Sequence, residues 1–402
     1  MQLARRPYSI MSTKACKQNR DEVAHHPCRA LYVHVPFCKA KCRYCGFYSV
    51  RCETPAACRY VHAAGIELTC REAELSDPLA SVYVGGGTPT ALGAELLAEL
   101  LSRWRPRIDE ATEFSVEANP GTLDEGIARA LAAAGVNRVN VGVQSFRDEE
   151  LRLLGRVHSA EEARRAVEVL RAAKIHNVGL DLIYGIPGQT LDSWQASVAE
   201  GLALRPEHLS CYCLSFEPGT PLEADLRAGR VQEMDEAVQE ACFRHAIAAC
   251  EESGLQHYEI SNFARPGRRC RQNVTYWRNE PYLGIGPGAV SYLRGVRRKN
   301  LPDVDAYVRA LSAGHPAPAS QEELTGRAAM AEAVMLSLRL REGLDRASFA
   351  ARYGCDVVEA FPGSLRRHVE FGSLEVTAKC VRIASKSLFV ADTILADILA
   401  EA

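Results

Sequence analysis

The sequence predicts an α/β fold, in which an open, partial barrel of six βα units precedes a small, mostly helical, winged-helix-like C-terminal domain. Three observations lead to this prediction. Apolar, β-branched segments alternate with helical patterns about every thirty residues from Leu31 onward, polar and glycine residues follow these segments at the same end, and the rhythm changes near residue 322. Six units are too few to close an eight-stranded barrel of the TIM type, so we expect a TIM-like barrel that stays open.

The individual elements follow from periodicity. Segments with the alternation or continuous apolar character of strands precede segments with apolar residues at helical spacing, and this order in series predicts a parallel sheet. The predicted strands cover 30–36, 80–84, 112–117, 138–143, 178–183 and 208–214. The predicted helices cover 54–74, 94–104, 123–134, 159–173, 190–203 and 230–253. In the C-terminal domain, further helices are predicted at 328–339 and 346–353, the second preceded by a turn with a cap at 343–345.

Composition limits the function classes. The chain has 402 residues and a formal net charge of −2, which gives no support to general nucleic-acid binding. No run of eighteen apolar residues exists, so no membrane span is predicted. The 15 cysteines are odd in number and scattered, which favours a reducing, cytoplasmic location over a disulfide framework.

We divide the chain into four parts. Residues 1–28 form a disordered or targeting extension, because five basic residues precede the first acid, Asp21; organelle targeting is the minor alternative. Residues 29–256 form the barrel, 257–321 a linker or crossover, and 322–402 the C-terminal domain. Acidic residues such as Glu370 and Asp397 leave that domain no basic face for DNA.

Three cysteines stand close together after the first predicted strand. Cys38, Cys42 and Cys45 are spaced four and then three apart, so their thiolates can converge on one side of a tight loop. A cuboidal iron–sulfur cluster needs such ligands, and with three of them one iron stays open to a small molecule. A zinc site or a chance cluster in a cysteine-rich chain is the alternative.

Further polar residues follow the next predicted strands. Glycines and Thr88 lie in the segment 85–90, Glu117 ends the third strand, and Gln144 follows the fourth, with Arg156 on the following loop or helix. Asp181 lies at the fifth. Each is a weak signal alone, typical of turns or helix caps. Together, at one end of parallel strands and around the cysteine loop, they predict one shared pocket.

These motifs resemble the radical S-adenosylmethionine (SAM) superfamily and, more narrowly, its HemN/HemW group. The resemblance covers about residues 30–400 and rests on four segments, which are Tyr-Val-His-Val-Pro-Phe-Cys at 32–38, Gly-Gly-Gly-Thr-Pro-Thr at 85–90, Gly-Val-Gln-Ser-Phe at 142–146, and Asp-Leu-Ile-Tyr-Gly-Ile-Pro-Gly at 181–188. It implies that Cys38, Cys42 and Cys45 hold a [4Fe–4S] cluster whose open iron binds SAM.

The resemblance also implies roles for residues around the cluster. Tyr32, Gly86 and Glu117 fall where the family contacts SAM. A second set falls where the oxygen-independent coproporphyrinogen enzyme holds a second SAM molecule; it comprises Tyr44, Gly87, Thr88, Gln144, Arg156 and Asp181. Their chemistry is suitable, because a carboxylate accepts hydrogen bonds from ribose hydroxyls or an ammonium and an arginine can fork onto a carboxylate.

Within the group, an enzyme and a carrier must be separated. The coproporphyrinogen III dehydrogenase pattern resembles Cys-x-x-x-Cys-x-x-Cys-x-Cys, whereas Phe47 stands at the last position here. This favours the HemW members, which are heme-binding chaperones that deliver heme to acceptor proteins and lack the dehydrogenase activity. The resemblance implies a heme cofactor, heme-acceptor partners, an electron donor, and membrane association only through a partner. A radical SAM enzyme is the alternative.

One position departs from the family pattern. The motif is usually written His-Asn-x-x-Tyr-Trp, and Gln272 takes the place of the histidine. Glutamine has no imidazole for heme iron. If the family histidine contributes to heme binding, this chain must ligate heme otherwise or more weakly. His34 and His257 lie near the pocket segments, but a lone histidine is more often structural, and neither is assigned as a ligand.

Overall fold

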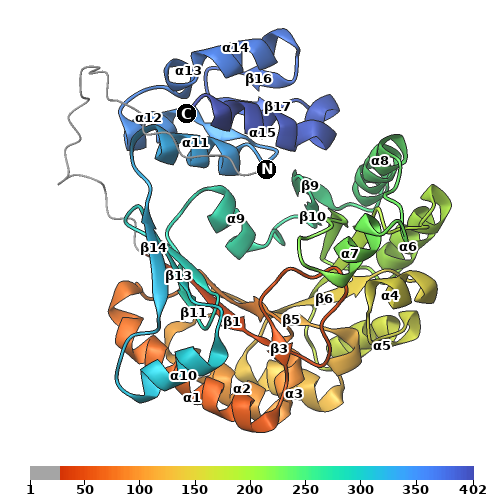
Figure 1. Ribbon diagram of the computed structural model, residues 1–402, viewed down its shortest axis with the longest axis vertical. Coiled ribbons are helices and arrows are strands. Elements are labelled where there is room, and N and C mark those ends of the chain that lie inside the picture. Colours follow the sequence, from red (N-terminus) through yellow and green to blue (C-terminus); the bar gives the residue numbers. More distant parts are fainter. Residues whose placement is uncertain (1–27) are drawn as a thin grey trace.

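A computed structural model describes residues 28–402 (Figure 1). Residues 1–27, on which the predicted extension falls, lie outside the described residues. The central feature is a nine-stranded sheet in the order β11-β1-β4-β5-β6-β7-β8-β10-β9. Six of these strands pair in parallel along the chain; they are β1 (Ala30–Val35), β4 (Ser81–Gly86), β5 (Glu113–Ala118), β6 (Arg138–Gln144), β7 (Asn177–Tyr184) and β8 (His208–Cys213).

Helices follow the strands and form an arc along the outer side of the sheet (Figure 1). The predicted partial barrel is confirmed. Six helices lie close to their predicted positions, namely α1 (Thr54–Arg71), α2 (Ala94–Ser102), α3 (Glu125–Ala134), α5 (Ala160–Ala172), α6 (Leu191–Ala203) and α8 (Glu236–Glu252). Two short helices, α4 (Asp148–Leu154) and α7 (Pro221–Arg227), were not predicted. Short 3₁₀ turns occur at Glu72–Glu74, Pro89–Leu92, Arg105–Arg107 and Pro120–Thr122.

Local capping explains where several helices begin and end. Ser159 and Glu162 form a reciprocal capping box at the start of α5, and Thr190 and Ser193 do the same for α6. Helix α3 ends at Gly135, whose φ of +84° suits a residue without a side chain. These signals are local, and therefore the sequence reveals them.

The two faces of the sheet differ in polarity because side chains alternate along each strand. The outer face, toward the helices, is apolar and fully buried, with Val33, Val82 and Val116 as examples. Full burial of such a side chain contributes about 1.5–3 kcal/mol. The inner face is polar, and its side chains bond to one another across strands, as Tyr83 does to Glu117.

Residues after β8 complete the sheet and cross back over the barrel. β9 (Gln256–Glu259) and β10 (Asn262–Ala264) extend it antiparallel beyond β8, while β11 (Leu283–Ile285) pairs in parallel with β1 on the other edge. Between them, α9 (Arg271–Trp277) contacts β1 and β4. Figure 1 shows α9 at the open side of the arc. A small sheet of β12 (Val290–Leu293), β13 (Val296–Asn300) and β14 (Ala319–Glu323) follows.

A buried carboxylate fastens this crossover to the barrel. Glu67 on α1 accepts hydrogen bonds from the Gly286 amide at 2.9 Å, Asn300 Nδ2 at 2.8 Å and the Tyr307 hydroxyl at 2.7 Å. Tyr307 belongs to α10 (Val304–Ser312), which packs on α1. Because the carboxylate has several donors, its burial costs little despite its charge.

The C-terminal domain is small and mostly helical, with a three-stranded antiparallel sheet in the order β15-β17-β16. Figure 1 shows it beyond α9, on the open side of the arc. The predicted helix at 346–353 is present, and Asp345 caps its first turn. The elements are α11 (Gly326–Ser337), β15 (Leu344–Asp345), α12 (Arg346–Tyr353), α13 (Val357–Ala360), α14 (Pro362–Glu370), β16 (Leu374–Val376), β17 (Cys380–Ile383), a 3₁₀ turn (Ser385–Val390) and α15 (Ala391–Ala400).

Candidate functional site

The cysteine loop is closed at its base by two short strands. β2 (Phe37–Cys38) pairs in parallel with β3 (Val50–Arg51). Backbone bonds from the Arg43 amide to the Leu154 carbonyl and from the Leu222 amide to the Arg43 carbonyl, both 2.9 Å, attach the loop to α4 and α7. The two helices that sequence reasoning missed therefore hold the loop in place.

Two polar side chains reach the loop's sulfur atoms. The Thr88 hydroxyl lies 3.5 Å from Cys38 Sγ, and a guanidinium nitrogen of Arg156 lies 3.4 Å from Cys42 Sγ. Burial raises the pKa of the Cys45 thiol, and the neighbouring charges of Cys42 and Cys38 raise this pKa further. Hydrogen bonds and a cation beside sulfur are what thiolate ligands of a cluster require.

The three thiols of the loop are a suitable donor set for a cluster, since Cys38, Cys42 and Cys45 are all free of disulfide bonds and partly exposed. Cysteines that bind a cuboidal cluster each take a different iron, so they need not converge on one point. Cys52, which also lies near Cys38, donates its thiol to the Ala91 carbonyl at 3.3 Å. The donor set therefore fits a cluster with three protein ligands.

The glycines at the end of β4 and directly after it allow close approach of three neighbouring groups. A Cβ on Gly85 would lie 2.7 Å from the Glu117 carboxyl carbon, and one on Gly87 would lie 2.6 Å from the Phe37 carbonyl oxygen. Gly86 has a φ of +107°, and a Cβ there would lie 2.5 Å from the His34 ring. Only glycine meets these demands, so the motif brings bare backbone against the carboxylate and the cysteine strand.

Glu117 lies half-buried at the end of β5. Its Oε1 accepts the Tyr83 hydroxyl at 2.7 Å, and its Oε2 accepts the Gly86 amide at 3.1 Å. Burial raises the pKa of Glu117 to about 7, the nearby Asp181 charge adds to the rise, and these two hydrogen bonds oppose it. A carboxylate of this kind suits a cationic ligand, because ionisation and binding favour each other.

Four residues of the second predicted SAM set, Tyr44, Gln144, Arg156 and Asp181, lie close to one another at the cysteine loop. Gln144, at the end of β6, has a φ of +69°, and its amide and the Arg156 guanidinium both lie close to Gly142. Arg156 also pairs with the Tyr44 hydroxyl, and burial raises the pKa of Tyr44. Burial raises the pKa of Asp181 too, while Ser210 and the Arg138 and Arg156 charges oppose that rise.

Tyr32 lies on β1 between these groups and the crossover. Its ring stacks on Tyr83, with 6.2 Å between ring centroids, and its hydroxyl lies 3.0 Å from His34 Nδ1. The other ring nitrogen of His34 lies 3.0 Å from the Tyr48 carbonyl oxygen. His257 lies 3.1 Å from the Ile260 carbonyl oxygen and stacks on Phe263. Both histidines therefore have structural partners.

Gln272 lies away from the cysteine loop. It is 1% exposed on α9, inside the barrel, where its Oε1 accepts the Ser81 hydroxyl at 2.9 Å. The position therefore packs against the start of β4, and any residue there would be shielded from solvent by the sheet. By contrast, Phe47 is 70% exposed at the cysteine loop.

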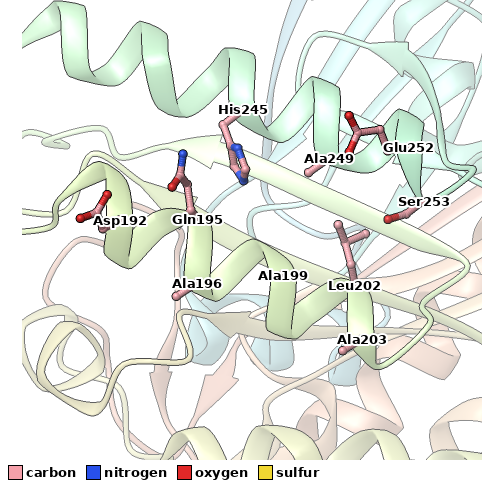
Figure 2. A pocket seen from close by; sticks show the side chains of 10 residues that line it. All are labelled: Asp192, Gln195, Ala196, Ala199, Leu202, Ala203, His245, Ala249, Glu252 and Ser253. Carbon is pink, nitrogen blue, oxygen red and sulfur yellow. The ribbon is translucent and has the colours of Figure 1, made fainter.

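Sequence reasoning missed several inner-face residues, among them Tyr83, Asn140 and Ser210. Alternation along the strands was the available signal. Asn140 pairs with Glu117 and Ser210 pairs with Asp181 on the neighbouring strand, and the partner of Tyr83 lies two residues before Glu117, so all three side chains share the face of the predicted site residues. A cavity of about 730 Å³ lies elsewhere, between α6 and α8, where small side chains such as Ala196 and Ala199 line it (Figure 2). None of the predicted site residues borders it.

Comparison with known families decides the relationship. The family model of the radical SAM superfamily matches residues 32–200, and that of the HemN C-terminal domain matches 324–390. "Heme chaperone HemW" of Bacillus subtilis is 32% identical over 377 residues, which are 93% of this chain and all of that protein. This chain belongs to the HemW family of radical SAM proteins. The HemW of Escherichia coli is 35% identical over 65% of this chain and 70% of its own.

A solved structure supports the fold of the HemW family member. Coproporphyrinogen III oxidase (HemN) from Escherichia coli, described as a radical SAM enzyme, matches with a TM-score of 0.80 at 23% identity, over 94% of this chain and 92% of that one. Membership of the radical SAM superfamily implies a [4Fe–4S] cluster and SAM. Within the described residues, no helix is both long and apolar enough to span a membrane.

Proposed function

We propose that this protein is a heme chaperone that binds a [4Fe–4S] cluster, SAM and heme, and delivers heme to acceptor proteins. Cys38, Cys42 and Cys45 would hold the cluster. The similarity to a protein named as a heme chaperone, over 93% of this chain, supports the proposal. Phe47 is the residue that favours a heme chaperone over an enzyme of porphyrin synthesis. It stands two residues after Cys45, where the dehydrogenase pattern has a fourth cysteine.

The site residues fit two SAM-binding roles. Tyr32, Gly86 and Glu117 would contact the SAM molecule on the open iron. The second group would hold a further SAM molecule or take part in the same pocket; it comprises Tyr44, Gly87, Thr88, Gln144, Arg156 and Asp181. When bound, a reduced cluster and SAM supply one-electron chemistry at the sulfonium, and the protein positions and shields them.

Heme acceptors and an electron donor for the cluster are the proposed partners. The side chains of Lys39, Lys41 and Arg51 are exposed on or beside the cysteine loop, and no acidic residue occurs between Val23 and Cys52. These basic side chains suit an electron donor with an acidic face, because complementary charge speeds encounter. The heme iron would be bound by a group other than Gln272.

Anaerobic reconstitution followed by two assays on one sample tests the proposal. We expect tight heme binding, seen as a Soret band that saturates on titration, and no conversion of coproporphyrinogen III. Cluster assembly should fail when the three cysteines of the loop are replaced by alanine, while Cys52→Ala serves as the matched control and should assemble it. Turnover of the porphyrinogen would instead support the alternative, an oxygen-independent coproporphyrinogen III dehydrogenase.

A further inference from the structure

A hydrogen-bond chain across the inner face of the barrel ends at Glu117. Tyr83 on β4 donates to Glu117 Oε1 at 2.7 Å, and its own oxygen lies 3.1 Å from Asn140 Nδ2 on β6. Asn140 Oδ1 in turn lies 3.2 Å from Nε of Arg138. The chain therefore crosses three strands, from β6 through β4 to β5.

The direction of this chain is fixed at its start. An arginine can only donate, so the side of Asn140 that faces Arg138 must be its carbonyl oxygen. The amide nitrogen of Asn140 then faces Tyr83 and donates to it. The Tyr83 hydroxyl has one proton to donate. Because the hydroxyl oxygen accepts the hydrogen bond from Asn140, its own proton goes to Glu117.

Arg138 is itself held in place by the crossover. It is fully buried, donates to the Arg268 carbonyl at 2.8 Å, and lies 3.7 Å from the Glu113 carboxylate. Glu113 also accepts the Arg271 amide at 2.8 Å. The start of the chain is thus fixed by the segment that leads into α9.

The charge state of Glu117 depends on the hydrogen bond that the Tyr83 hydroxyl donates to it. Burial raises the pKa of Glu117 to about 7, the Asp181 charge raises it further, and the Tyr83 hydrogen bond lowers it. The other titratable groups near Glu117 are Tyr32 on β1 and Tyr276 on α9, both phenols whose pKa burial raises above the ordinary value. Tyr83 is therefore the side chain that favours the ionised carboxylate.

We propose that Tyr83 is a positioning residue for SAM binding, which Asn140 and Arg138 orient so that its hydroxyl donates to Glu117. The inference rests on the proposed function, since it takes Glu117 as a SAM contact. The Tyr83 hydroxyl fixes the direction of the carboxylate and keeps it as an acceptor for the ligand's ammonium or ribose hydroxyls. Without it, Glu117 binds a proton more readily and SAM less tightly.

Titration calorimetry of SAM with the reconstituted protein, between about pH 6 and 8, tests this. Tyr83→Phe should weaken SAM binding by about tenfold to a hundredfold near pH 7, and the pH at which affinity rises should shift upward. Tyr307→Phe is the matched control. The Tyr307 hydroxyl on α10 also donates to a buried carboxylate at 2.7 Å, but that carboxylate belongs to Glu67 on α1. The control variant should leave SAM affinity and its pH dependence unchanged.

A second pair of variants tests the direction of the chain, and replaces the first if Tyr83→Phe does not fold. Asn140→Asp offers Tyr83 a competing carboxylate, so its proton turns away from Glu117 and SAM binding should weaken as in Tyr83→Phe. Asn140→Ala removes the group that orients Tyr83 but adds no competing acceptor, so Tyr83 can still donate to Glu117 and SAM binding should weaken less than in Asn140→Asp. Equal effects of the two substitutions would overturn the assigned direction.

The outcomes separate the two proposals. If wild-type protein with an assembled cluster does not bind SAM, the proposed function fails and the inference with it. If wild type binds SAM and Tyr83→Phe behaves as Tyr307→Phe does, with the same pH dependence, the role of Tyr83 is refuted and the proposed function stands.

Discussion

Gly85→Ala isolates the contribution of the Glu117 carboxylate. An added Cβ would lie 2.7 Å from the Glu117 carboxyl carbon and 2.8 Å from both oxygens, so the carboxylate has to move by several tenths of an ångström to reach ordinary contact distance. Gly85 does not have the left-handed φ of Gly86, so the substitution adds no such backbone strain. The group that moves is the end of a side chain, and the fold should tolerate the change.

The expected loss follows from the bonds that this movement breaks. Glu117 is held by the Tyr83 hydroxyl at 2.7 Å and the Gly86 amide at 3.1 Å. A hydrogen bond to a charged group contributes about 1.5–3 kcal/mol, so loss of one should weaken SAM binding about tenfold to a hundredfold. Because Gly85 is buried, the overpacking should also lower the free energy of unfolding, by about 1–3 kcal/mol.

Calorimetric SAM titration and thermal unfolding on the same preparations measure both quantities. Gly201→Ala, on α6, is the control, since its Cβ would make ordinary contacts of 3.5 Å with the Leu182 and Phe146 side chains. It should leave SAM affinity unchanged and should not lower stability. Unchanged SAM affinity in Gly85→Ala would refute the claim that the glycine motif exists to bring backbone against Glu117.

Three further predictions concern other parts of the site. Cys42→Ala should abolish the brown cluster chromophore after reconstitution, and an unchanged absorption spectrum would refute its assignment as a ligand. Glu117→Gln should stabilise the cofactor-free protein above pH 7 by about 1–3 kcal/mol, because the folded-state pKa of about 7 exceeds the ordinary 4.5 and the proton's stabilising effect is lost as pH rises between these values. The difference should vanish below pH 4.5, and equal melting temperatures at pH 8 would contradict this. Gln272→His should leave heme affinity unchanged in a Soret titration, since the position is buried against Ser81; about a tenfold gain would show that it reaches heme.

Much of the barrel could be predicted because its signals are local. The βα alternation placed all six parallel strands and their helices, and a cap at Asp345 placed α12. Helix α4 was missed, since its seven residues are too few to show a helical period. The cysteine spacing and the strand-end residues indicated one pocket, and Arg156 contacts Cys42 as this arrangement requires.

Other features depend on contacts between distant residues and could not be predicted. Tyr83 stands between two valines in an apolar strand, and its partner Asn140 is 57 residues away. The position of Gln272 beneath β4 depends on how α9 enters the barrel, 191 residues after Ser81. The motif identifies such a residue by type, while only the fold shows whether it faces the ligand or the core.

Heme transfer is the measurement that tests the central claim most directly. The reconstituted protein is loaded with heme, separated from excess, and mixed with an apo-form of a heme protein, while the Soret spectrum reports which protein holds the heme. Our account predicts that heme moves to the acceptor, and that coproporphyrinogen III stays unconverted in the same sample. Failure to bind or release heme, with conversion of the porphyrinogen, would contradict it.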